Sequence, residues 1–385
     1  MQLYGYRRPD GRVGFRNHVL ILPTAICSAS VAEKIAQLVP GTTWANNNTG
    51  CCLLGEDIDI YRRTIVNTAG HPNVAATLII GLGCETISAA MAAAEIEKFG
   101  KPVRHLAIQT DGGVRGTIEK GVILAKELLA YASKSKREPA SVSDLIVGLE
   151  CGGSDPASGI TANPATGAAV DRVIDEGGSA ILGETDEWIG AEMILTSRAK
   201  TKAIARDTLR LVRRFERHVK AHGSNLSDGQ PTRGNQAAGL STIEEKSLGC
   251  ISKLGSREIS EVLEYSEIPT KKGAILLDTP GFDVTSVVGI VAGGCQVIVF
   301  TTGLGTPVGN PIAPVIKVSS NSLTYERMKD AIDINAGTIL EGKETIAGVG
   351  NRIYEMILRV LSGEMPKAEQ LGQIQYGIWR ATTEL

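Results

Sequence analysis

Short apolar runs that end in glycine-rich polar loops alternate with helical segments along most of this 385-residue chain. Residues 18–22, 74–80, 103–108 and 145–149 are such runs, and a segment with helical spacing follows each of them. Alternation of strands and helices favours parallel sheets, because a parallel connection has to cross over the sheet. The pattern predicts an α/β protein with two Rossmann-like parallel-sheet domains and helices on both faces of each sheet.

The most loop-like stretch of the chain is residues 224–239, which contain glycines, a proline and several Asn, Gln and Asp residues. Long loops of this composition mark domain boundaries or active-site loops. We therefore expect an N-terminal α/β domain over residues 1–223, opening with an arginine- and glycine-rich leader, and a C-terminal α/β domain over residues 224–385. The active site is expected in the crevice between them.

Composition excludes several classes of partner. Forty basic and 42 acidic residues give a net charge of −2, and no basic stripe interleaved with aromatic residues occurs, so nucleic acid is not an expected partner. No apolar run approaches about 18 residues, and the N-terminus lacks a secretory signal core. The seven cysteines, most of them beside glycine, do not resemble a disulfide framework. A cytoplasmic protein with reduced thiols and no membrane contact is expected.

Residues 151–164 form the stretch with the densest polar chemistry. They follow the apolar run 145–149 and bring two adjacent glycines and five short polar side chains to the start of a helical segment. Ligands bind where a strand of an α/β sheet leads through glycines to a helix. The alternative is an ordinary Gly-Ser loop in which Thr161 or Asn163 caps the helix.

Almost every predicted strand ends in a loop that carries glycine together with Cys, Thr, Asp or Glu. Because these loops converge at the carboxyl edge of a parallel sheet, their thiols and carboxylates are suited to bind a divalent metal such as iron or zinc. The alternative is that the cysteines are small buried hydrophobic residues. The glycines at 303–309 match a dinucleotide fingerprint only imperfectly, and neither a Walker lysine nor a serine-hydrolase elbow occurs.

Arginines cluster before the first strand, at positions 7, 8, 12 and 16. Guanidinium groups at this spacing are suited to hold a carboxylate or another oxyanion bidentately. A solvated basic leader is the alternative interpretation.

Several motifs resemble those of the altronate and galactarate dehydratase family, and the resemblance extends over nearly the whole chain. The matching stretches include Cys151-Gly152-Gly153-Ser154-Asp155 and lie at residues 11–17, 81–85, 109–113, 151–164, 184–185, 234–242, 245–249, 278–281 and 300–303. The resemblance implies a lyase that removes the C2 proton and the C3 hydroxyl of a sugar acid to leave a 2-oxo acid. It also implies a divalent cofactor, Fe²⁺ by preference, with Mn²⁺ or Mg²⁺ as alternatives.

The chain departs from the family pattern in two places. Full-length members begin with a small domain of about 100 residues, an ordinary domain size, whereas this sequence starts at the arginine-glycine motif. The sulfolactate sulfo-lyase branch, which eliminates sulfite, resembles a split enzyme, so we expect a separate small subunit and a homo- or hetero-oligomer. Asn48 also stands before Thr49-Gly50-Cys51, where the dehydratases usually have a histidine.

From side-chain chemistry and the convergence of the loops, we expect three classes of site residue. The expected metal ligands are Cys51, Cys84 and Cys151. The expected substrate-binding residues are Arg12, Arg16, Asn17, Gly152, Gly153, Ser154, Ser158, Asn163, Thr301 and Thr302. The expected catalytic residues are Glu85, Asp155, Thr161, Glu184 and Lys246. The substrate is expected to be a sugar acid or a sulfonated hydroxy acid, and a subunit that binds such an acid without catalysis is the competing hypothesis.

Overall fold

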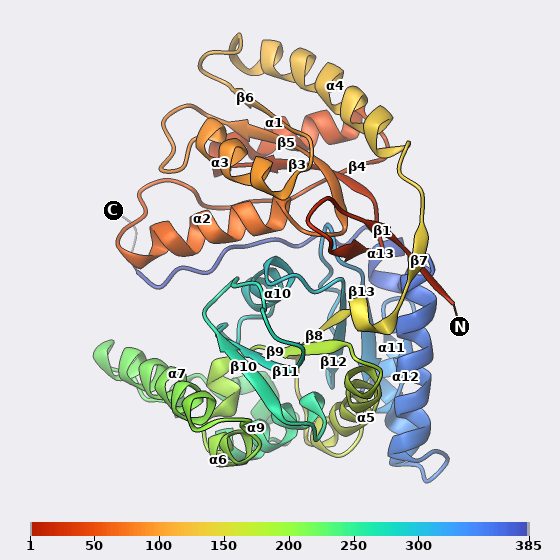
Figure 1. The fold of residues 1–385 in the computed structure, drawn as a ribbon. Helices are drawn as coiled ribbons and strands as arrows, with labels where there is room; N and C mark the ends of the chain where they lie inside the picture. The colour runs from red at the N-terminus through yellow and green to blue at the C-terminus, as the bar shows by residue number, and fades with distance from the viewer. Residues whose placement is uncertain (1, 383–385) are drawn as a thin grey trace.

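The computed structural model describes residues 2–382 and contains two parallel sheets, one above the other in Figure 1. The smaller sheet has the strand order β4-β3-β5-β6. Its strands are β3 (His18–Pro23), β4 (Thr42–Trp44), β5 (Val74–Gly81) and β6 (Val103–Ala107). Every residue of β5 is buried, as expected for a central strand that is covered on both faces.

The larger sheet has seven parallel strands in the order β10-β11-β9-β8-β12-β13-β14. Its strands are β8 (Ile146–Gly152), β9 (Ser179–Leu182), β10 (Ile259–Leu263), β11 (Gly273–Leu277), β12 (Val297–Thr302), β13 (Val315–Ser319) and β14 (Ile334–Asn335). The predicted α/β class with two parallel sheets is thereby confirmed.

Helices cover both faces of each sheet. On the smaller sheet, α1 (Ile26–Leu38) and α4 (Gly113–Ala132) pack on the outer face, and α2 (Glu56–Ala69) and α3 (Ala89–Ile96) pack on the inner face. On the larger sheet, α10 (Asp283–Ala292) covers the inner face. The outer face is covered mainly by α5 (Ala162–Asp175), α7 (Lys202–Ala221), α9 (Ile243–Ile251) and α12 (Ile346–Leu361). The shorter helices are α6 (Glu192–Ser197), α8 (Arg233–Ala237), α11 (Ser322–Arg327) and α13 (Lys367–Gln370).

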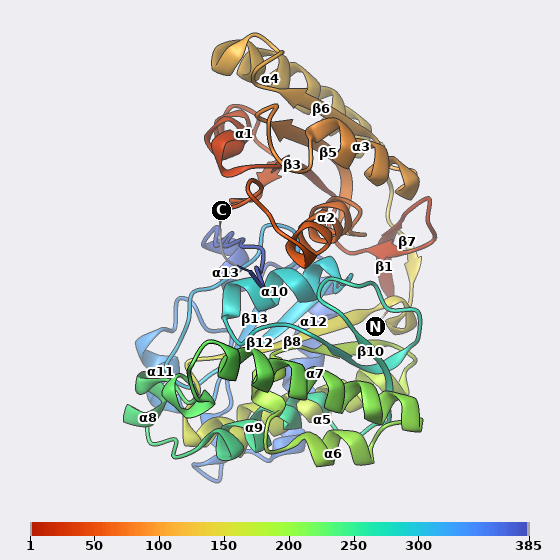
Figure 2. The same ribbon diagram turned by 90° about the vertical axis from the view of Figure 1, so that its left-hand side faces the viewer.

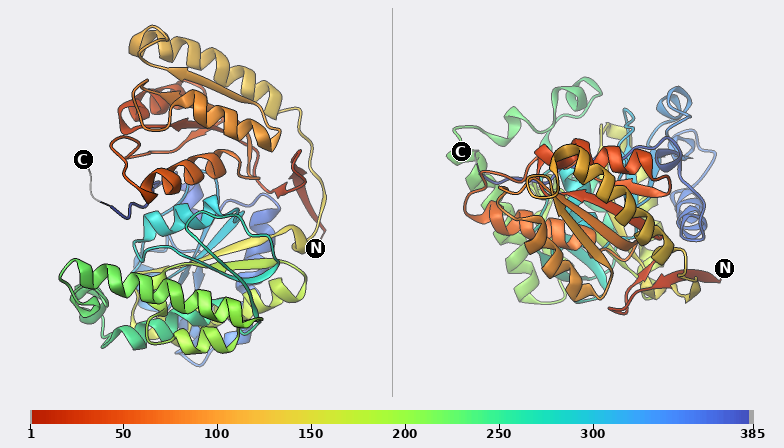
Figure 3. Two further views of the ribbon diagram at one scale, coloured as in Figure 1. Left: turned by 60° about the vertical axis from the view of Figure 1, so that its left-hand side comes forward. Right: turned by 90° about the horizontal axis from the view of Figure 1, so that it is seen from above.

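The two sheets share one apolar core. α2 and α10 lie between them, so the layers follow one another as helices, sheet, helices, sheet and helices (Figures 2 and 3). The middle core joins side chains from both sheets, such as Leu22 and Phe300, around the two helices. Because apolar area buried in one layer is shared by both halves, the halves stabilise each other.

The chain passes from one sheet to the other near residues 133–145. A small antiparallel sheet lies beside this crossing, formed by β1 (Leu3–Arg7), β2 (Val13–Gly14) and β7 (Glu138–Ala140). The expected division at residues 223–224 does not coincide with a boundary between sheets, because β10 and β11 pair beside β9 and extend the sheet that β8 and β9 began. The loop at 224–239 instead lies along one end of the larger sheet.

Several helices begin at residues that the sequence pattern marks as caps. The hydroxyls of Thr201, Thr242 and Thr345 accept hydrogen bonds from backbone N–H groups in the first turns of α7, α9 and α12. Such caps satisfy donors that the helix itself leaves free. Among the described residues, no helix is both long and apolar enough to cross a membrane.

Candidate metal centre and adjoining cavity

The carboxyl ends of β8 and β9 carry three of the reactive side chains. Cys151 is the second-to-last residue of strand β8. Glu184 lies shortly after β9 and has a left-handed backbone conformation (φ 63°). The 3₁₀ turn at Thr185–Trp188 then places Glu187 three residues after Glu184. All three side chains are buried.

Helix α9 and the turn that follows it carry three more. Lys246, Cys250 and Lys253 lie at positions i, i+4 and i+7, so they share one face of the helical segment. This face packs toward the ends of β8 and β9. As a result, residues about 100 positions apart in the sequence meet at one point, as is usual at the carboxyl edge of a parallel sheet.

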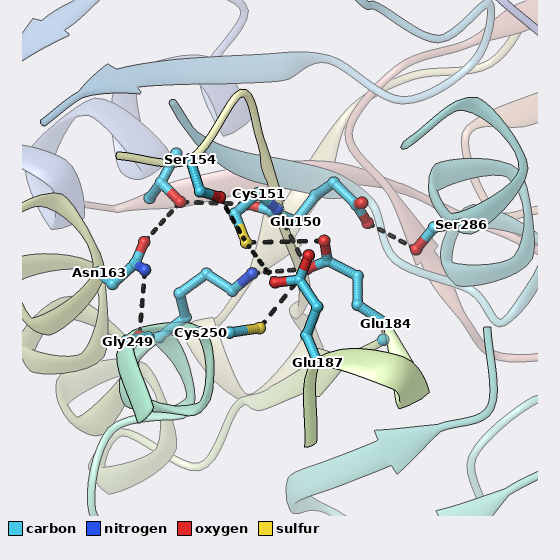
Figure 4. A network of polar contacts seen from close by, with 12 residues as sticks. Glu150, Cys151, Ser154, Asn163, Glu184, Glu187, Gly249, Cys250 and Ser286 are labelled. Carbon is cyan, nitrogen blue, oxygen red and sulfur yellow. Dashed lines mark hydrogen bonds and ion pairs between the residues drawn. The ribbon is translucent and has the colours of Figure 1, made fainter. Parts of the chain in front are cut away.

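Cys151, Glu184, Glu187 and Cys250 form a compact group that we call the thiol–carboxylate cluster. One ligand atom from each residue lies within 4.8 Å of every other. The Cys151 Sγ atom lies 3.2 Å from Glu187 Oε2 and 3.6 Å from Glu184 Oε1, and the Cys250 Sγ atom lies 3.9 Å from Glu184 Oε2. Figure 4 shows the two thiols and the two carboxylates facing one another.

Two lysines pair with the two carboxylates of the cluster. The Lys253 Nζ atom lies 2.6 Å from Glu184 Oε2, and both side chains are fully buried. The Lys246 Nζ atom lies 2.7 Å from Glu187 Oε1 at the edge of the cluster. Each carboxylate therefore uses one oxygen for a lysine and directs the other toward Cys151, an arrangement that balances charge in a buried site.

Burial and charge set the protonation of the cluster. Burial, together with the negative charge of Glu187, raises the pKa of Glu184. Burial alone would raise the pKa of Glu187 too, but Lys246 and Lys253 hold it below its ordinary value. A contact with Cys250 favours the Cys151 thiolate, but burial and the two glutamates outweigh it and raise the pKa of Cys151. Burial likewise raises the pKa of Cys250. Without a metal, both thiols keep their protons.

The cluster has the donor set of a divalent metal site. With both thiols protonated, two carboxylates balance two ammonium groups, so the cluster is neutral. One divalent cation that replaces the two thiol protons leaves this balance unchanged. Two sulfur and two oxygen donors suit iron or zinc better than magnesium.

A cavity of about 230 Å³ opens beside the cluster. Cys151 and Lys246 line it from one side, and Ser154, Asn163 and Leu240 line it from the others. The loop after β8 turns sharply at Gly153, which has a left-handed backbone conformation (φ +61°). The Asp283 side chain occupies the space where a side chain on Gly152 would lie. A Cβ atom on Gly152 would lie 2.2 Å from Asp283 Oδ2, so a larger residue there would require the Asp283 side chain to move.

The other polar residues of the loop after β8 hold the loop itself. The Asp155 carboxylate accepts hydrogen bonds from Ser158, Ser320 and Asn321. The Thr161 hydroxyl donates to Ser320 O at 2.8 Å. Asp155 and Thr161 were expected to be catalytic, and Ser158 was expected to bind substrate. Their contacts fix the loop against the chain after β13, and Asp155 and Ser158 also line the cavity.

Of the other predicted substrate-binding residues, Ser154 and Asn163 line the cavity. Asn163 donates to Gly249 O and accepts from Thr301, so it joins α5 to α9 and β12. Thr302 accepts a hydrogen bond from Gly305 N. Ser154 has its hydroxyl 3.9 Å from Cys151 Sγ and remains the polar group of this loop that faces both cluster and cavity.

Cys51, Cys84 and Glu85 lie at the carboxyl edge of the smaller sheet, apart from the cluster. The two thiols are exposed, and neither belongs to the group of close ligand atoms found among the described residues. The Glu85 carboxylate accepts hydrogen bonds from Thr24 Oγ1 and Gly83 N, which fix the turn after β5. Of the three predicted ligands, only Cys151 is in the cluster.

The N-terminal arginines tie the leader to the rest of the molecule. Arg16 forms a bidentate ion pair with Glu369 and donates to Val360 O and Glu364 O. Arg12 pairs with Asp10 and donates to Gly70 O. Asn17 donates to Ala132 O. Arg16 and Asn17 thus hold segments together, whereas Arg12 has one buried nitrogen, Nη1, without a hydrogen-bond partner among the described residues. The predicted contact of these residues with substrate stays a prediction.

The prediction missed Glu187, Cys250 and Lys253. Glu187 follows Glu184 by one 3₁₀ turn, and Lys246, Cys250 and Lys253 have a spacing that places them on one face of the helical segment. Both patterns are visible in the sequence. Polar groups at helical spacing that are expected to be buried indicate a site.

A larger cavity of about 460 Å³ lies between α2 and α7. Its charged groups satisfy one another, since Arg214 pairs with both Glu264 and Asp278. It contains no member of the cluster. Chemistry is therefore concentrated at the smaller cavity.

Comparison with known families agrees with this architecture. The model of the D-galactarate/altronate dehydratase C-terminal domain matches residues 142–384, and that of the second domain of D-galactarate dehydratase/altronate hydrolase matches residues 5–133. The two matches meet at the crossing between the sheets.

Individual relatives are similar over most of the chain. The chain is 36% identical to the (2R)-sulfolactate sulfo-lyase subunit beta of Chromohalobacter salexigens, over 98% of this chain and 96% of that protein. It is 36% identical to the altronate dehydratase of Bacillus subtilis, over 95% of this chain and 75% of that protein. It is 34% identical to the galactarate dehydratase (L-threo-forming) of Escherichia coli, over 94% of this chain and 72% of that protein. The chain therefore belongs to the D-galactarate/altronate dehydratase family, and it is a lyase.

Proposed function

We propose that the chain catalyses metal-dependent elimination of water from a 2-hydroxy sugar acid to give a 2-oxo acid. The observation that carries this proposal is the buried thiol–carboxylate cluster beside a polar cavity. Two relatives that are similar over most of the chain are named as sugar-acid dehydratases, which supports the same reaction class.

The cluster would hold the metal through Cys151, Cys250 and one oxygen each of Glu184 and Glu187. A bound divalent cation, Fe²⁺ by preference with Mn²⁺ or Mg²⁺ as alternatives, would stabilise the negative charge that develops as the C2 proton leaves. Lys253 keeps the carboxylate of Glu184 in place from the buried side.

The acid role follows from the charges around the cavity. Burial would lower the pKa of Lys246, but Glu187 and Cys151 raise it, so Lys246 is an ammonium group able to donate a proton to the leaving C3 hydroxyl. Glu184 was also expected to be catalytic, but it does not line the cavity and its two oxygens face the metal position and Lys253, so we assign it to holding the metal. Ser154 is placed to hydrogen-bond a substrate hydroxyl.

Elimination of sulfite is the second candidate reaction. It is favoured by the similarity to a protein named as a sulfolactate sulfo-lyase subunit. The same metal site and Lys246 would serve, because C–S cleavage next to a carbanion has the same charge development as C–O cleavage. The word "subunit" in that name also supports a second polypeptide as a partner and an oligomeric enzyme, which we propose here too.

The test is reconstitution with metal and a choice of substrates. The chain, alone and co-expressed with a small partner of this family, is loaded anaerobically with Fe²⁺ and incubated with altronate, galactarate and 3-sulfolactate. We expect 2-oxo acid without sulfite, and equal amounts of 2-oxo acid and sulfite would favour the second reaction. If metal is bound and neither product forms, the chain is better described as a binding subunit without catalysis of its own.

A matched pair of variants ties the activity to the cluster. Cys250→Ser removes one ligand, whereas Cys295→Ser changes a thiol that is equally buried but lies far from any carboxylate of the cluster. Loss of product and of bound metal in the first variant only is the expected result. Equal loss in both would show that the effect comes from packing.

A further inference from the structure

The loop at residues 224–239 contacts the segment that follows β8 at several points. Asn235, in α8, donates a hydrogen bond to Ser154 O at 2.9 Å, and Gly239 packs against Pro156. Both contacts connect the loop to the segment that follows β8. The loop therefore supports a segment that lines the cavity, and Leu240, the residue directly after the loop, lines the cavity itself.

Gln230 is the residue of this loop that reaches Lys246. Its Oε1 atom accepts a hydrogen bond from Lys246 Nζ at 2.7 Å, and its Nε2 atom donates to Asp186 Oδ2 at 2.8 Å. An ammonium group can only donate, so the orientation of the Gln230 amide is fixed by its neighbours. Asp186 is 2% exposed, and its other oxygen, Oδ1, has no hydrogen-bond partner among the described residues.

This arrangement defines the direction of the Lys246 ammonium group. An ammonium group has three N–H bonds. One is directed at Glu187 Oε1 and a second at Gln230 Oε1. The third remains for the cavity that Lys246 lines. With only the Glu187 contact, the group would be free to rotate about its last C–N bond.

We propose that Gln230 is a positioning residue, anchored by Asp186, that directs one N–H bond of Lys246 into the cavity. This proposal rests on the proposed function, in which Lys246 donates a proton to the leaving group. Asp186 has the supporting role of keeping the amide oxygen of Gln230 turned toward Lys246. Neither residue needs to touch the substrate.

The first test is Gln230→Leu, which keeps a similar volume and removes both hydrogen bonds. Misplacing a catalytic group by about 1 Å reduces the rate by about 100-fold, so we expect kcat to fall between about 10-fold and 100-fold. KM and bound metal should change little, since the cluster is intact. Gln236→Leu is the control, because Gln236 lies on the same loop and its side chain donates to Pro231 O rather than to Lys246 or Asp186. An unchanged kcat in Gln230→Leu would overturn the proposal.

The second test separates positioning from a general need for the loop to fold. Gln230→Glu retains the acceptor for Lys246 but faces Asp186 with a second carboxylate. In the double variant Gln230→Glu/Asp186→Asn, the asparagine donates to the new glutamate, so the hydrogen-bond chain and its total charge are restored. We expect a low kcat in the single variant and recovery in the double variant. Failure to recover, with normal thermal unfolding, would contradict the proposal.

The two levels of inference fail in different ways. If the unmodified protein eliminates neither water nor sulfite, the proposed function fails. If it is active and the Gln230→Leu variant matches it in both kcat and KM, only the positioning role fails.

Discussion

The molecule carries two groups of cysteines at equivalent places, the carboxyl edges of its two parallel sheets. At the larger sheet, Cys151 and Cys250 are buried and face two carboxylates and two lysines. At the smaller sheet, four cysteines are exposed, namely Cys27, Cys51, Cys52 and Cys84. Only the first group has charged neighbours arranged to exchange thiol protons for a metal. Position in the fold brings thiols together, but their charged surroundings decide what they can bind.

The difference depends on the lysines more than on the thiols. A buried carboxylate that faces two thiols has a large desolvation cost, and an ammonium group has to offset it. Lys253 does so from a position with no exposure to solvent. The exposed cysteines are accessible to water, so they need no such ammonium group.

The largest expected effect follows removal of the buried charge. Lys253→Met leaves Glu184 without its partner, and breaking a buried ion pair typically costs about 3–5 kcal/mol. We expect the free energy of unfolding, measured by urea denaturation, to fall by that amount. Lys120→Met is the control, because Lys120 pairs with Asp111 at the surface of the smaller half. A similar loss in both variants would remove the contrast between the two edges.

The next effect concerns metal binding. Cys151→Ala should lower metal affinity by about 100-fold or more, since even residues that only orient ligands contribute about 10-fold to 100-fold. Cys84→Ala should leave affinity unchanged. Metal content after dialysis against a graded chelator measures both. If Cys84→Ala loses the metal instead, the site belongs at the smaller sheet.

A smaller effect should be visible in the pH dependence of stability. Burial lowers the pKa of His71 well below its ordinary value of 6.5, and its ring lies 3.0 Å from Cys295 O between the two halves. Below pH 6.5 the unfolded chain binds a proton that the folded chain does not, so stability falls as the pH falls. The expected slope is up to about 1.4 kcal/mol per pH unit for this group.

Denaturation in urea between pH 7 and pH 5 measures this slope, and the NMR signal of the His71 ring follows its protonation directly. Cys295 is buried next to this ring and lies outside the thiol–carboxylate cluster, so its surroundings differ from those of both cysteine groups compared above. A His71 titration midpoint near 6.5 would contradict the expected linkage.

The smallest perturbation is chemical labelling of the native protein. Iodoacetamide should modify the exposed cysteines first, because the thiolate reacts and needs access. Burial raises the pKa values of Cys151, Cys250 and Cys295, so these three should react only after unfolding. Mass spectrometry of peptides taken over time gives the order. Early labelling of Cys151 would mean that the cluster opens to solvent.

The sequence alone determined the class of fold, the family and part of the site. Alternating periodicity is a local property, so the parallel sheets could be predicted from it. Cys151, Glu184 and Lys246 could be selected because they follow apolar runs or lie in long motifs. The spacing of Glu187 and Cys250 could also be read from the sequence, but only their burial in the structure shows that this spacing marks a site.

Only the tertiary structure decided which of these side chains meet. The pairing of β10 with β11, and of β11 with β9, places α9 beside Cys151, although about 100 residues separate them in the chain. In the same way, Arg16 meets Glu369 across 353 positions, which converts an expected substrate clamp into a structural tie. Contacts between distant segments depend on the order of strands in the sheet, and local sequence patterns do not encode that order.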